Sequence, residues 1–332
     1  MKNVLVLSTG GTIVSEPETG GLAPQADSAE LFRALEPLSN RFSITHRQIL
    51  NLDSSNIQPE EWILIAKEIE RALPNYDGIV VTHGTDTMAY TSAAVTFMLR
   101  NLHKSVVFTG SQIPLASPLS DGRTNLATAF AAVEAGIPGV NLAFHYKLIS
   151  GCRAVKVRSM GLDAFASVNY PYRGRIYADG VAIEDFAQKD RHPDAKTTLE
   201  AALCSAVFLL KLFPGTDPRI LDLLPKLHCR GLVLETFGAG GLHIARRDLV
   251  EGIQALVECG VAVVVCSQCL YDWSDISIYR VGKALADAGV IEGRDMTTEA
   301  AVTKLMWALG KTTDIAEIRK IFATDYAGEI TL

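Results

Sequence analysis

The sequence predicts an α/β protein of two domains, each with a mostly parallel β-sheet flanked by helices in Rossmann-type layers. Short apolar runs alternate with amphipathic segments from the first residues onward, and this alternation is typical of parallel sheets covered by helices on both faces. The 332 residues are enough for about two domains of roughly 150 residues each. Hydrophobic residues make up 48% of the chain and charged residues 20%, so the composition is that of a globular protein.

The first half of the chain predicts four strands, each followed by a helix. Apolar runs indicate the strands, while helical periodicity and residues suited to helix starts indicate the helices. Ser28 is a candidate N-cap, and Pro59 opens a helix whose first turn carries two glutamates. The expected strands are residues 3–8, 42–50, 78–82 and 105–109, and the expected helices are 28–38, 58–73, 87–99 and 121–135.

Regular alternation weakens between about residues 150 and 197 and then resumes. We therefore expect an N-terminal α/β domain over residues 1–190, a linker and lead-in strand over 191–212, and a smaller C-terminal α/β domain over 213–332. The expected strands of the second half are 206–212, 231–236 and 261–266, and the expected helices are 218–227, 245–259, 277–288, 298–309 and 314–322.

Charge and apolar patterning argue against several classes of function. The net charge is −6 and no long basic run occurs, so a nucleic-acid surface is not expected. The apolar run Val4–Leu7 is too short for a signal peptide, and no stretch approaches the roughly 20 apolar residues of a membrane span. The six cysteines are scattered, and Cys266-x-x-Cys269 lacks the second pair of a zinc site. We expect free thiols in a cytoplasmic protein that binds neither nucleic acid nor membrane.

Polar residues follow four successive predicted strands. Each such loop alone is explained by turn formation or helix capping, but ligands of open parallel sheets bind beyond the carboxyl ends of the strands. Four polar loops at one sheet edge therefore favour a site for a small polar ligand. The loops are Thr9-Gly10-Gly11-Thr12-Ile13, Asp53-Ser54-Ser55-Asn56, Thr82-His83-Gly84-Thr85-Asp86-Thr87 and Thr109-Gly110-Ser111-Gln112.

The chemistry of these loops is that of hydroxyl nucleophiles rather than phosphate binding. The first loop has neither the Gly-Lys-Ser/Thr of a phosphate-binding loop nor the spacing of a dinucleotide site. A hydroxyl needs a neighbouring group that takes its proton, and no Ser-His-Asp arrangement is evident. A desolvated, neutral lysine is an alternative base, but the residues by themselves do not choose one.

The motifs resemble those of the bacterial-type L-asparaginases. Thr9-Gly10-Gly11-Thr12-Ile13 and His83-Gly84-Thr85-Asp86-Thr87 carry the resemblance, which extends over nearly the whole chain. The segments Asp295–Ala300 and Lys304–Trp307 are similar to the cytoplasmic, type I branch. The resemblance implies an asparaginase-like fold without cofactor or metal, hydrolysis of L-asparagine to L-aspartate and ammonia in asparagine catabolism, and an intimate homodimer that is often doubled to a homotetramer.

The resemblance also implies roles for individual residues. Thr12 matches the nucleophile that forms the acyl-enzyme, Thr85 the second catalytic threonine, and Lys156 the lysine that contacts it. Asp86 matches the carboxylate that binds the substrate α-ammonium group, and Ser54 with its neighbours matches the loop that holds the α-carboxylate. The implied catalytic residues are Thr12, Thr85, Asp86 and Lys156, and the implied substrate-binding residues are Gly11, Asp53, Ser54, Ser55, Thr85 and Asp86.

Two positions depart from the family pattern. Many members carry a tyrosine near the nucleophile where this chain has Leu22, so either another tyrosine enters, or Lys156 and Thr85 carry the proton, or activity is low. Cys269 matches a cysteine tied to an allosteric asparagine site, but Glu235 stands where the accompanying arginine is expected. A carboxylate there repels the ligand's α-carboxylate, so we expect no allosteric asparagine site of that kind. We expect His83 to brace its loop rather than transfer protons.

Three functions remain open at this stage. The first is an asparaginase, with glutamine as a weaker substrate, because one methylene typically changes discrimination by only about 1–3 kcal/mol. The second is the D subunit of a glutamyl-tRNA amidotransferase, which has the same fold but an extra N-terminal domain, whereas the first strand here is expected from Asn3. The third is a non-catalytic amino-acid sensor, which the Leu22 position favours and the retained threonines, Asp86 and Lys156 oppose.

Overall fold

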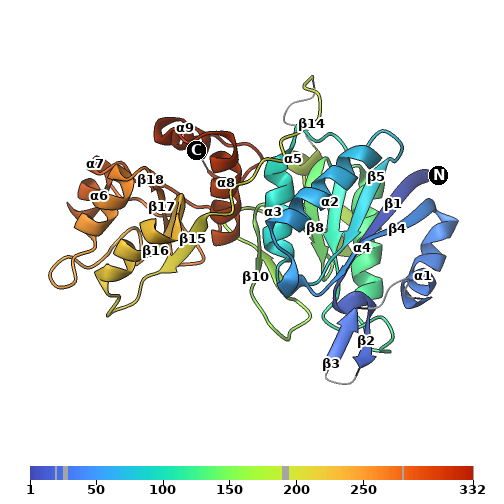
Figure 1. The fold of residues 1–332 in the computed structure, drawn as a ribbon. Coiled ribbons are helices and arrows are strands. Elements are labelled where there is room, and N and C mark those ends of the chain that lie inside the picture. Colours follow the sequence, from blue (N-terminus) through green and yellow to red (C-terminus); the bar gives the residue numbers. More distant parts are fainter. Residues whose placement is uncertain (19–20, 25–28, 189–193, 279, 332) are drawn as a thin grey trace. The chain divides into compact units, whose positions relative to one another are not determined.

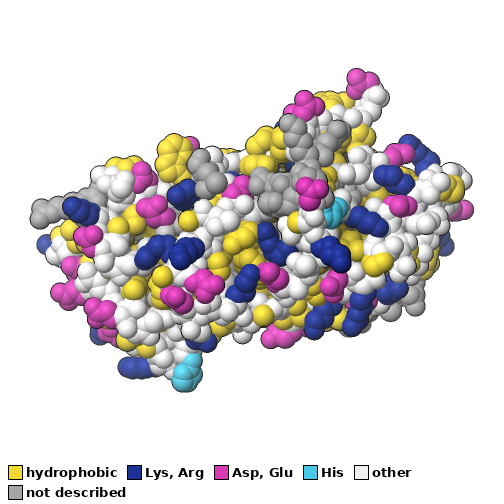
Figure 2. Space-filling model, turned by 90° about the horizontal axis from the view of Figure 1, so that it is seen from above, with side chains coloured by type: hydrophobic (Ala, Val, Ile, Leu, Met, Phe, Trp, Pro, Cys, Tyr) yellow, Lys and Arg dark blue, Asp and Glu magenta, His cyan; other side chains and the backbone are white. Residues whose placement is uncertain are grey.

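The computed structural model describes the chain except for residues 19–20, 25–28, 189–193, 279 and 332 (Figure 1). The chain divides into two compact units, Met1–Ala201 and Ala202–Leu332. Each unit has its own sheet flanked by helices, which confirms the predicted fold class. None of the helices in the described residues is long and apolar enough to cross a membrane. On the face shown in Figure 2, basic and acidic side chains are interspersed.

The first unit is built on an eight-stranded sheet, in which five neighbouring strands at one side are parallel. In order across the sheet these are β4 (Phe42–Leu52), β1 (Lys2–Gly10), β5 (Gly78–Thr82), β7 (Ser105–Thr109) and β8 (Gly139–Phe144). The four strands predicted for this half are therefore confirmed. Because they are parallel neighbours, their carboxyl ends lie at one edge of the sheet, where the four polar loops begin.

Three antiparallel strands extend this sheet and were not predicted, nor was β8. They are β9 (Lys147–Ser150), β12 (Gly174–Tyr177) and β13 (Gly180–Ile183). The turn between β8 and β9 consists of His145 and Tyr146, which have φ values of 47° and 62°. Tight hairpin turns that need positive φ are normally marked by Asn-Gly or Asp-Gly. The residue pattern therefore carries no hairpin signal here.

Helices cover both faces of the large sheet (Figure 1). On one face, α1 (Ala29–Leu35) and α4 (Gly122–Ala135) pack against strand residues such as Val4 and Val80. The alternate strand residues point to the other face, where α2 (Pro59–Ala72) and α3 (Met88–Met98) lie. The predicted cap Ser28 lies outside the described residues. The helix predicted over 28–38 ends at Leu35. The 3-10 turn η2 (Glu36–Asn40), which contains Pro37, follows it directly.

Short hairpins and one extra strand pair complete the first unit. After β1 come η1 (Thr12–Val14) and the hairpin of β2 (Ser15–Glu18) and β3 (Gly21–Pro24). A second hairpin, β10 (Ala154–Lys156) with β11 (Phe165–Ser167), carries Lys156. After the short helix α5 (Asp185–Gln188), β14 (Thr198–Leu199) pairs with β6 (Leu99–Arg100) and keeps the chain in the first unit up to Ala201.

The second unit has a four-stranded parallel sheet with an apolar core of its own. The strands, in order, are β15 (Val207–Lys211), β16 (Gly231–Thr236), β17 (Ala262–Ser267) and β18 (Ile291–Glu292). The helices are α6 (Val250–Glu258), α7 (Arg280–Asp287), α8 (Thr298–Lys311) and α9 (Ile315–Ala323). Leu232 and Leu234 of the sheet share a buried cluster with Ile253 and Leu256 of α6.

Two helices predicted for this unit were wrong in kind or extent. Residues 218–227 form two 3-10 turns, η4 (Pro218–Leu223) and η5 (Pro225–Leu227), because Pro225 has no N–H to continue a helix. The predicted helix 245–259 begins only at Val250. Arg247 has a φ of 54°, which is incompatible with a helix, and the Asp248 carboxylate accepts the Val250 N–H at 2.8 Å.

A fully buried ion pair holds the last turn of the chain to α8. Lys304 Nζ lies 2.6 Å from Glu329 Oε1, and both side chains have no exposed surface. Lys304 also donates to the Thr324 carbonyl at 2.9 Å, and Glu329 accepts the N–H groups of Tyr326 and Ala327. Such a pair is stable only when every charge is satisfied.

Removing one partner should therefore destabilise the second unit strongly. We expect Lys304→Met to lower the free energy of unfolding by about 3–5 kcal/mol, because it leaves the Glu329 carboxylate buried without its cation. The double variant Lys304→Met/Glu329→Leu should recover most of that loss, and the exposed Lys226→Met should change little. Urea unfolding followed by circular dichroism measures all three, and a cost below about 1 kcal/mol for Lys304→Met would contradict the expectation.

Candidate active site

The loops after β1, β4 and β5 meet because two glycines leave room for them. Gly11 has a φ of 80°, and a Cβ atom there would lie 2.4 Å from the backbone nitrogen of Gly84. A Cβ atom on Gly84 would in turn lie 2.6 Å from Ser54 Oγ. Neither position accepts another residue without displacing backbone or the buried serine. The structure therefore brings Gly11, Ser54 and Thr85 together, as the strand order predicts.

The Ser54 loop is fixed by its own carboxylate and by the next loop. Asp53 caps the 3-10 turn η3 (Ser54–Asn56), because its Oδ1 accepts the Ser55 N–H at 2.8 Å and the Ser55 hydroxyl at 2.6 Å. The Thr87 hydroxyl donates to the Ser54 carbonyl at 2.7 Å, and Ser54 Oγ accepts the Asp86 N–H at 3.3 Å. Ser54 is buried, whereas Asp53 and Ser55 are exposed.

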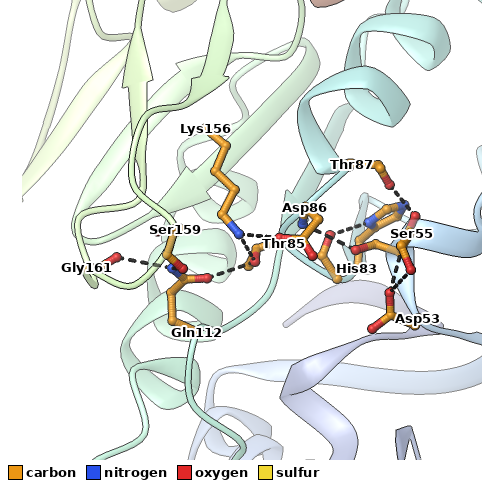
Figure 3. A network of polar contacts seen from close by, with 12 residues as sticks. Asp53, Ser55, His83, Thr85, Asp86, Thr87, Gln112, Lys156, Ser159 and Gly161 are labelled. Carbon is orange, nitrogen blue, oxygen red and sulfur yellow. Dashed lines mark hydrogen bonds and ion pairs between the residues drawn. The ribbon is translucent and has the colours of Figure 1, made fainter. Parts of the chain in front are cut away.

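Lys156 joins Thr85 and Asp86 in a three-residue polar centre (Figure 3). Its Nζ donates to Thr85 Oγ1 at 2.8 Å and to Asp86 Oδ1 at 2.5 Å. Only 16% of the Lys156 side chain is exposed, against 65% of the Asp86 side chain. Lysines are mostly exposed, so a largely covered lysine in contact with a hydroxyl and a carboxylate is an unusual arrangement. Lys156 lies on the β10–β11 hairpin; only the family resemblance had indicated this lysine, and the hairpin itself was not predicted.

Gln112 is a member of this network that sequence reasoning did not select. Its Oε1 accepts the Thr85 hydroxyl at 2.8 Å, and its Nε2 donates to the carbonyls of Ser159 and Gly161 at 3.0 and 3.3 Å (Figure 3). The feature of the sequence that could have indicated Gln112 is its position in the loop after β7, at the same sheet edge as the other polar loops. A single polar residue in a turn is too common to stand out.

Thr12 lies at the start of η1, directly after the close approach of Gly11 to Gly84. The Thr12 side chain is half-buried and makes no hydrogen bond with another described residue. The hairpin that follows carries Leu22, whose backbone is paired with Pro17 in the β2–β3 register. Thr12 thus has a hydroxyl that no other described residue engages, next to the loop that holds Thr85.

His83 is a buried brace beneath the Thr85 loop. Its Nδ1 lies 2.7 Å from the Gly84 carbonyl and its Nε2 lies 2.9 Å from Thr91 Oγ1. A neutral ring that donates from Nδ1 and accepts at Nε2 satisfies both contacts. Burial lowers the pKa of His83 to about 4, although the Gly84 hydrogen bond works in the opposite direction. The ring is therefore uncharged near neutral pH.

Glu235 lies in the second unit, at the end of β16. Its carboxylate is buried, accepts the Thr298 hydroxyl and lies 3.6 Å from Lys211 Nζ. Cys266 is buried, and burial raises the pKa of its thiol to about 12, whereas Cys269 is exposed. Among the described residues, no three His, Cys, Asp or Glu side chains are grouped to hold a metal ion. The absence of an allosteric asparagine site remains a prediction.

The chain is a two-unit α/β protein with a hydroxyl–lysine–carboxylate centre at one sheet edge, and comparison with known proteins identifies the family. Residues 3–189 match the family model described as "Asparaginase, N-terminal", and residues 206–322 match "Glutaminase/Asparaginase C-terminal domain". The chain belongs to the asparaginase family, as the motifs predicted.

Individual relatives match over nearly the full length. An L-asparaginase of Thermococcus kodakarensis is 43% identical over 99% of both chains. The solved structure of the thermostable L-asparaginase from that organism has a TM-score of 0.93 at 42% identity, again over 99% of each chain. L-asparaginase I of Vibrio cholerae has a TM-score of 0.90 at 32% identity, over 100% of this chain and 99% of that one. The D subunit of the Pyrococcus abyssi glutamyl-tRNA(Gln) amidotransferase is 37% identical over 100% of this chain but 77% of its own length.

The buried His83 should make stability depend on pH in a defined window. Its pKa is 6.5 when unfolded and about 4 in the fold, so between these values the unfolded state binds more protons and stability falls as the pH drops. The free energy of unfolding is lower by roughly 3 kcal/mol once the pH is below about 4 than it is above pH 6.5.

The His83→Gln variant isolates this contribution. We expect the stability difference between wild type and variant to shrink as the pH falls from about 7 to 4, measured by urea unfolding at each pH. A difference that is constant over this range would show that His83 is not held neutral.

Proposed function

We propose that this chain is an L-asparaginase, which hydrolyses the side-chain amide of L-asparagine to L-aspartate and ammonia. The observation that carries the proposal is the contact of Lys156 with both Thr85 Oγ1 and Asp86 Oδ1, beside the Ser54 loop. A hydroxyl, an amine and a carboxylate within one small polar site suit an amino-acid amide. The 43% identity to an L-asparaginase over 99% of both chains supports the same substrate.

The substrate's two charged groups have matching partners in this site. The exposed Asp86 carboxylate would bind the α-ammonium group by a charge-assisted hydrogen bond. Ser54 Oγ and the N–H groups of its loop would receive the α-carboxylate. Because these two contacts fix the α-carbon, they also fix the distance to the side-chain amide, which would favour asparagine over glutamine. One methylene leaves that preference modest.

We assign the nucleophile to Thr12. Its oxygen attacks the amide carbon, forms an ester to the enzyme and releases ammonia, and a water molecule then hydrolyses the ester to give aspartate. Backbone N–H groups near Gly11 and Thr85 are suited to the oxyanion, where one donor is commonly worth about 3 kcal/mol. Lys156 and Thr85 would carry the proton from the nucleophile to the leaving nitrogen, which suits a chain that has Leu22 at the tyrosine position of many relatives.

Oligomeric state and cellular location are proposed mainly from the family resemblance. Large apolar side chains are exposed on the second unit, among them Phe213, Leu227, Tyr271 and Trp273. We propose a homodimer or homotetramer from the family resemblance, and these exposed side chains are candidates for its interface. A cytoplasmic location is proposed from the type I motifs, and one structural relative is titled a probable cytoplasmic L-asparaginase from Campylobacter jejuni.

Ammonia release tests the activity and the nucleophile together. The purified wild type should release ammonia from L-asparagine and more slowly from L-glutamine, while Thr12→Ala should lose at least about 10³-fold in kcat. Turnover that survives in Thr12→Ala would move the nucleophile to Thr85. Saturable asparagine binding without any ammonia release by the wild type would favour the sensor, and release that requires tRNA and a second protein would favour the amidotransferase.

The role of Lys156 has its own test. Lys156→Met keeps the length of the side chain but removes the ammonium group, so kcat should fall by about 10²–10⁴-fold. Lys67→Met, on the exposed face of α2, is the matched control and should retain wild-type activity. Equal activity of the two variants would rule out proton transfer through Lys156.

Oligomeric state is measured independently of activity. Light scattering after gel filtration should give twice or four times the mass of one chain, and Trp273→Glu should shift the mass towards one chain if its exposed ring lies in an interface. A wild-type mass of one chain at micromolar concentration would contradict the proposal.

A further inference from the structure

Gln112 occupies a fixed orientation between the catalytic centre and a surface loop. The loop is residues 157–164, which connect β10 to β11, and Met160 at its tip is 87% exposed. Gln112 Nε2 faces two loop carbonyls, those of Ser159 and Gly161. Carbonyl oxygens only accept hydrogen bonds, so the amide nitrogen must point to the loop and Oε1 must point to Thr85.

This orientation determines the direction of the Thr85 hydroxyl proton. Thr85 Oγ1 lies 2.8 Å from Gln112 Oε1 and 2.8 Å from Lys156 Nζ. Gln112 Oε1 can only accept a hydrogen bond, whereas Lys156 Nζ donates one to Thr85 Oγ1. The single Thr85 proton therefore goes to Gln112, and a lone pair of Thr85 faces Lys156.

The backbone of Gln112 is held as firmly as its side chain. The N–H groups of Gln112 and Ile113 donate to the Asp121 carboxylate at 3.1 and 3.0 Å. Asn125 Nδ2 in turn binds Asp121 at 3.0 Å and the Gly110 carbonyl at 2.9 Å. The carboxamide thus extends from a fixed base and can hold Thr85 in one rotamer.

The loop is tied at two further points. Arg158 Nη1 donates to the Asp163 carbonyl at 2.7 Å, and Lys147 Nζ lies 2.5 Å from the Asp163 carboxylate. Partial burial disfavours the charged form of Asp163, but the Lys147 hydrogen bond and charge outweigh it and lower its pKa. Lys147 therefore holds the loop through the Asp163 carboxylate, and Gln112 is its link to the catalytic centre.

We infer that Gln112 is a positioning residue for the proposed amidohydrolase reaction, which orients the Thr85 hydroxyl and couples it to the position of the 157–164 loop. The inference rests on the proposed function for its kinetic part only. It requires that loss of the carboxamide both misdirect the Thr85 proton and release the loop, while Asp86 and the Ser54 loop keep their places.

Two variants separate this role from simple space filling. Gln112→Met keeps the volume but neither accepts from Thr85 nor donates to the loop, so kcat should fall about 10–100-fold while KM changes less than about threefold. Gln112→Glu in its protonated form can still accept from Thr85 and donate once to the loop, whereas its ionised form cannot donate. Its kcat relative to wild type should therefore fall at least fivefold between pH 5 and pH 8.

Trypsin cleavage after Arg158 reports the loop without any substrate. With fragments identified by mass, Gln112→Met should be cut at this bond at least fivefold faster than wild type, and Gln254→Met, a matched change on α6, should match wild type in cleavage and kinetics. Unchanged kcat and cleavage in Gln112→Met would overturn the inference, as would a raised KM with unchanged kcat, which would place Gln112 on the substrate. If the wild type releases no ammonia, the proposed function fails, and cleavage alone decides the coupling.

Discussion

The contact of one ammonium group with a hydroxyl and a carboxylate is the interaction on which the site depends. Lys156 reaches Thr85 and Asp86 only because the β10–β11 hairpin presents it to the sheet edge where β5 ends. The parallel order β4-β1-β5-β7 brings the other polar loops to the same edge. The large sheet is thus a frame that holds side chains from distant parts of the sequence within hydrogen-bond distance of one another.

Close backbone packing is the second constraint, and it falls on two glycines. The approach of Gly11 to Gly84, and of Gly84 to Ser54, leaves no space for a Cβ atom. His83 supports the same loop from below and stays neutral because it is buried. The geometry of the site is therefore set by the absence of side chains as much as by their presence. The glycines and His83 take no part in the chemistry, but they position the groups that do.

Much of the fold was predictable, and the failures have physical causes. Buried strands such as 78–82 and 105–109 were predicted at their observed bounds, because short continuous apolar runs between turn residues are typical of strands buried on both faces. The His145–Tyr146 turn lacked the usual residues of a tight hairpin, so the antiparallel extension was missed. At the site, strand-end loops could be predicted as a group, but Lys156 came only from the family resemblance. Gln112 acts through contacts with residues 159 and 161, which no local pattern reveals.

The ion pair between Lys156 and Asp86 has a consequence for how any charged ligand enters. With 65% of its side chain exposed, the Asp86 carboxylate is reachable, yet it already has a cation. Lys156 engages only Oδ1, so an incoming ammonium group meets a carboxylate whose charge Lys156 already partly offsets. Added salt screens the attraction to Asp86 and the repulsion by Lys156 together. Ligand affinity at this carboxylate should consequently vary less with ionic strength than the charge of the groups suggests.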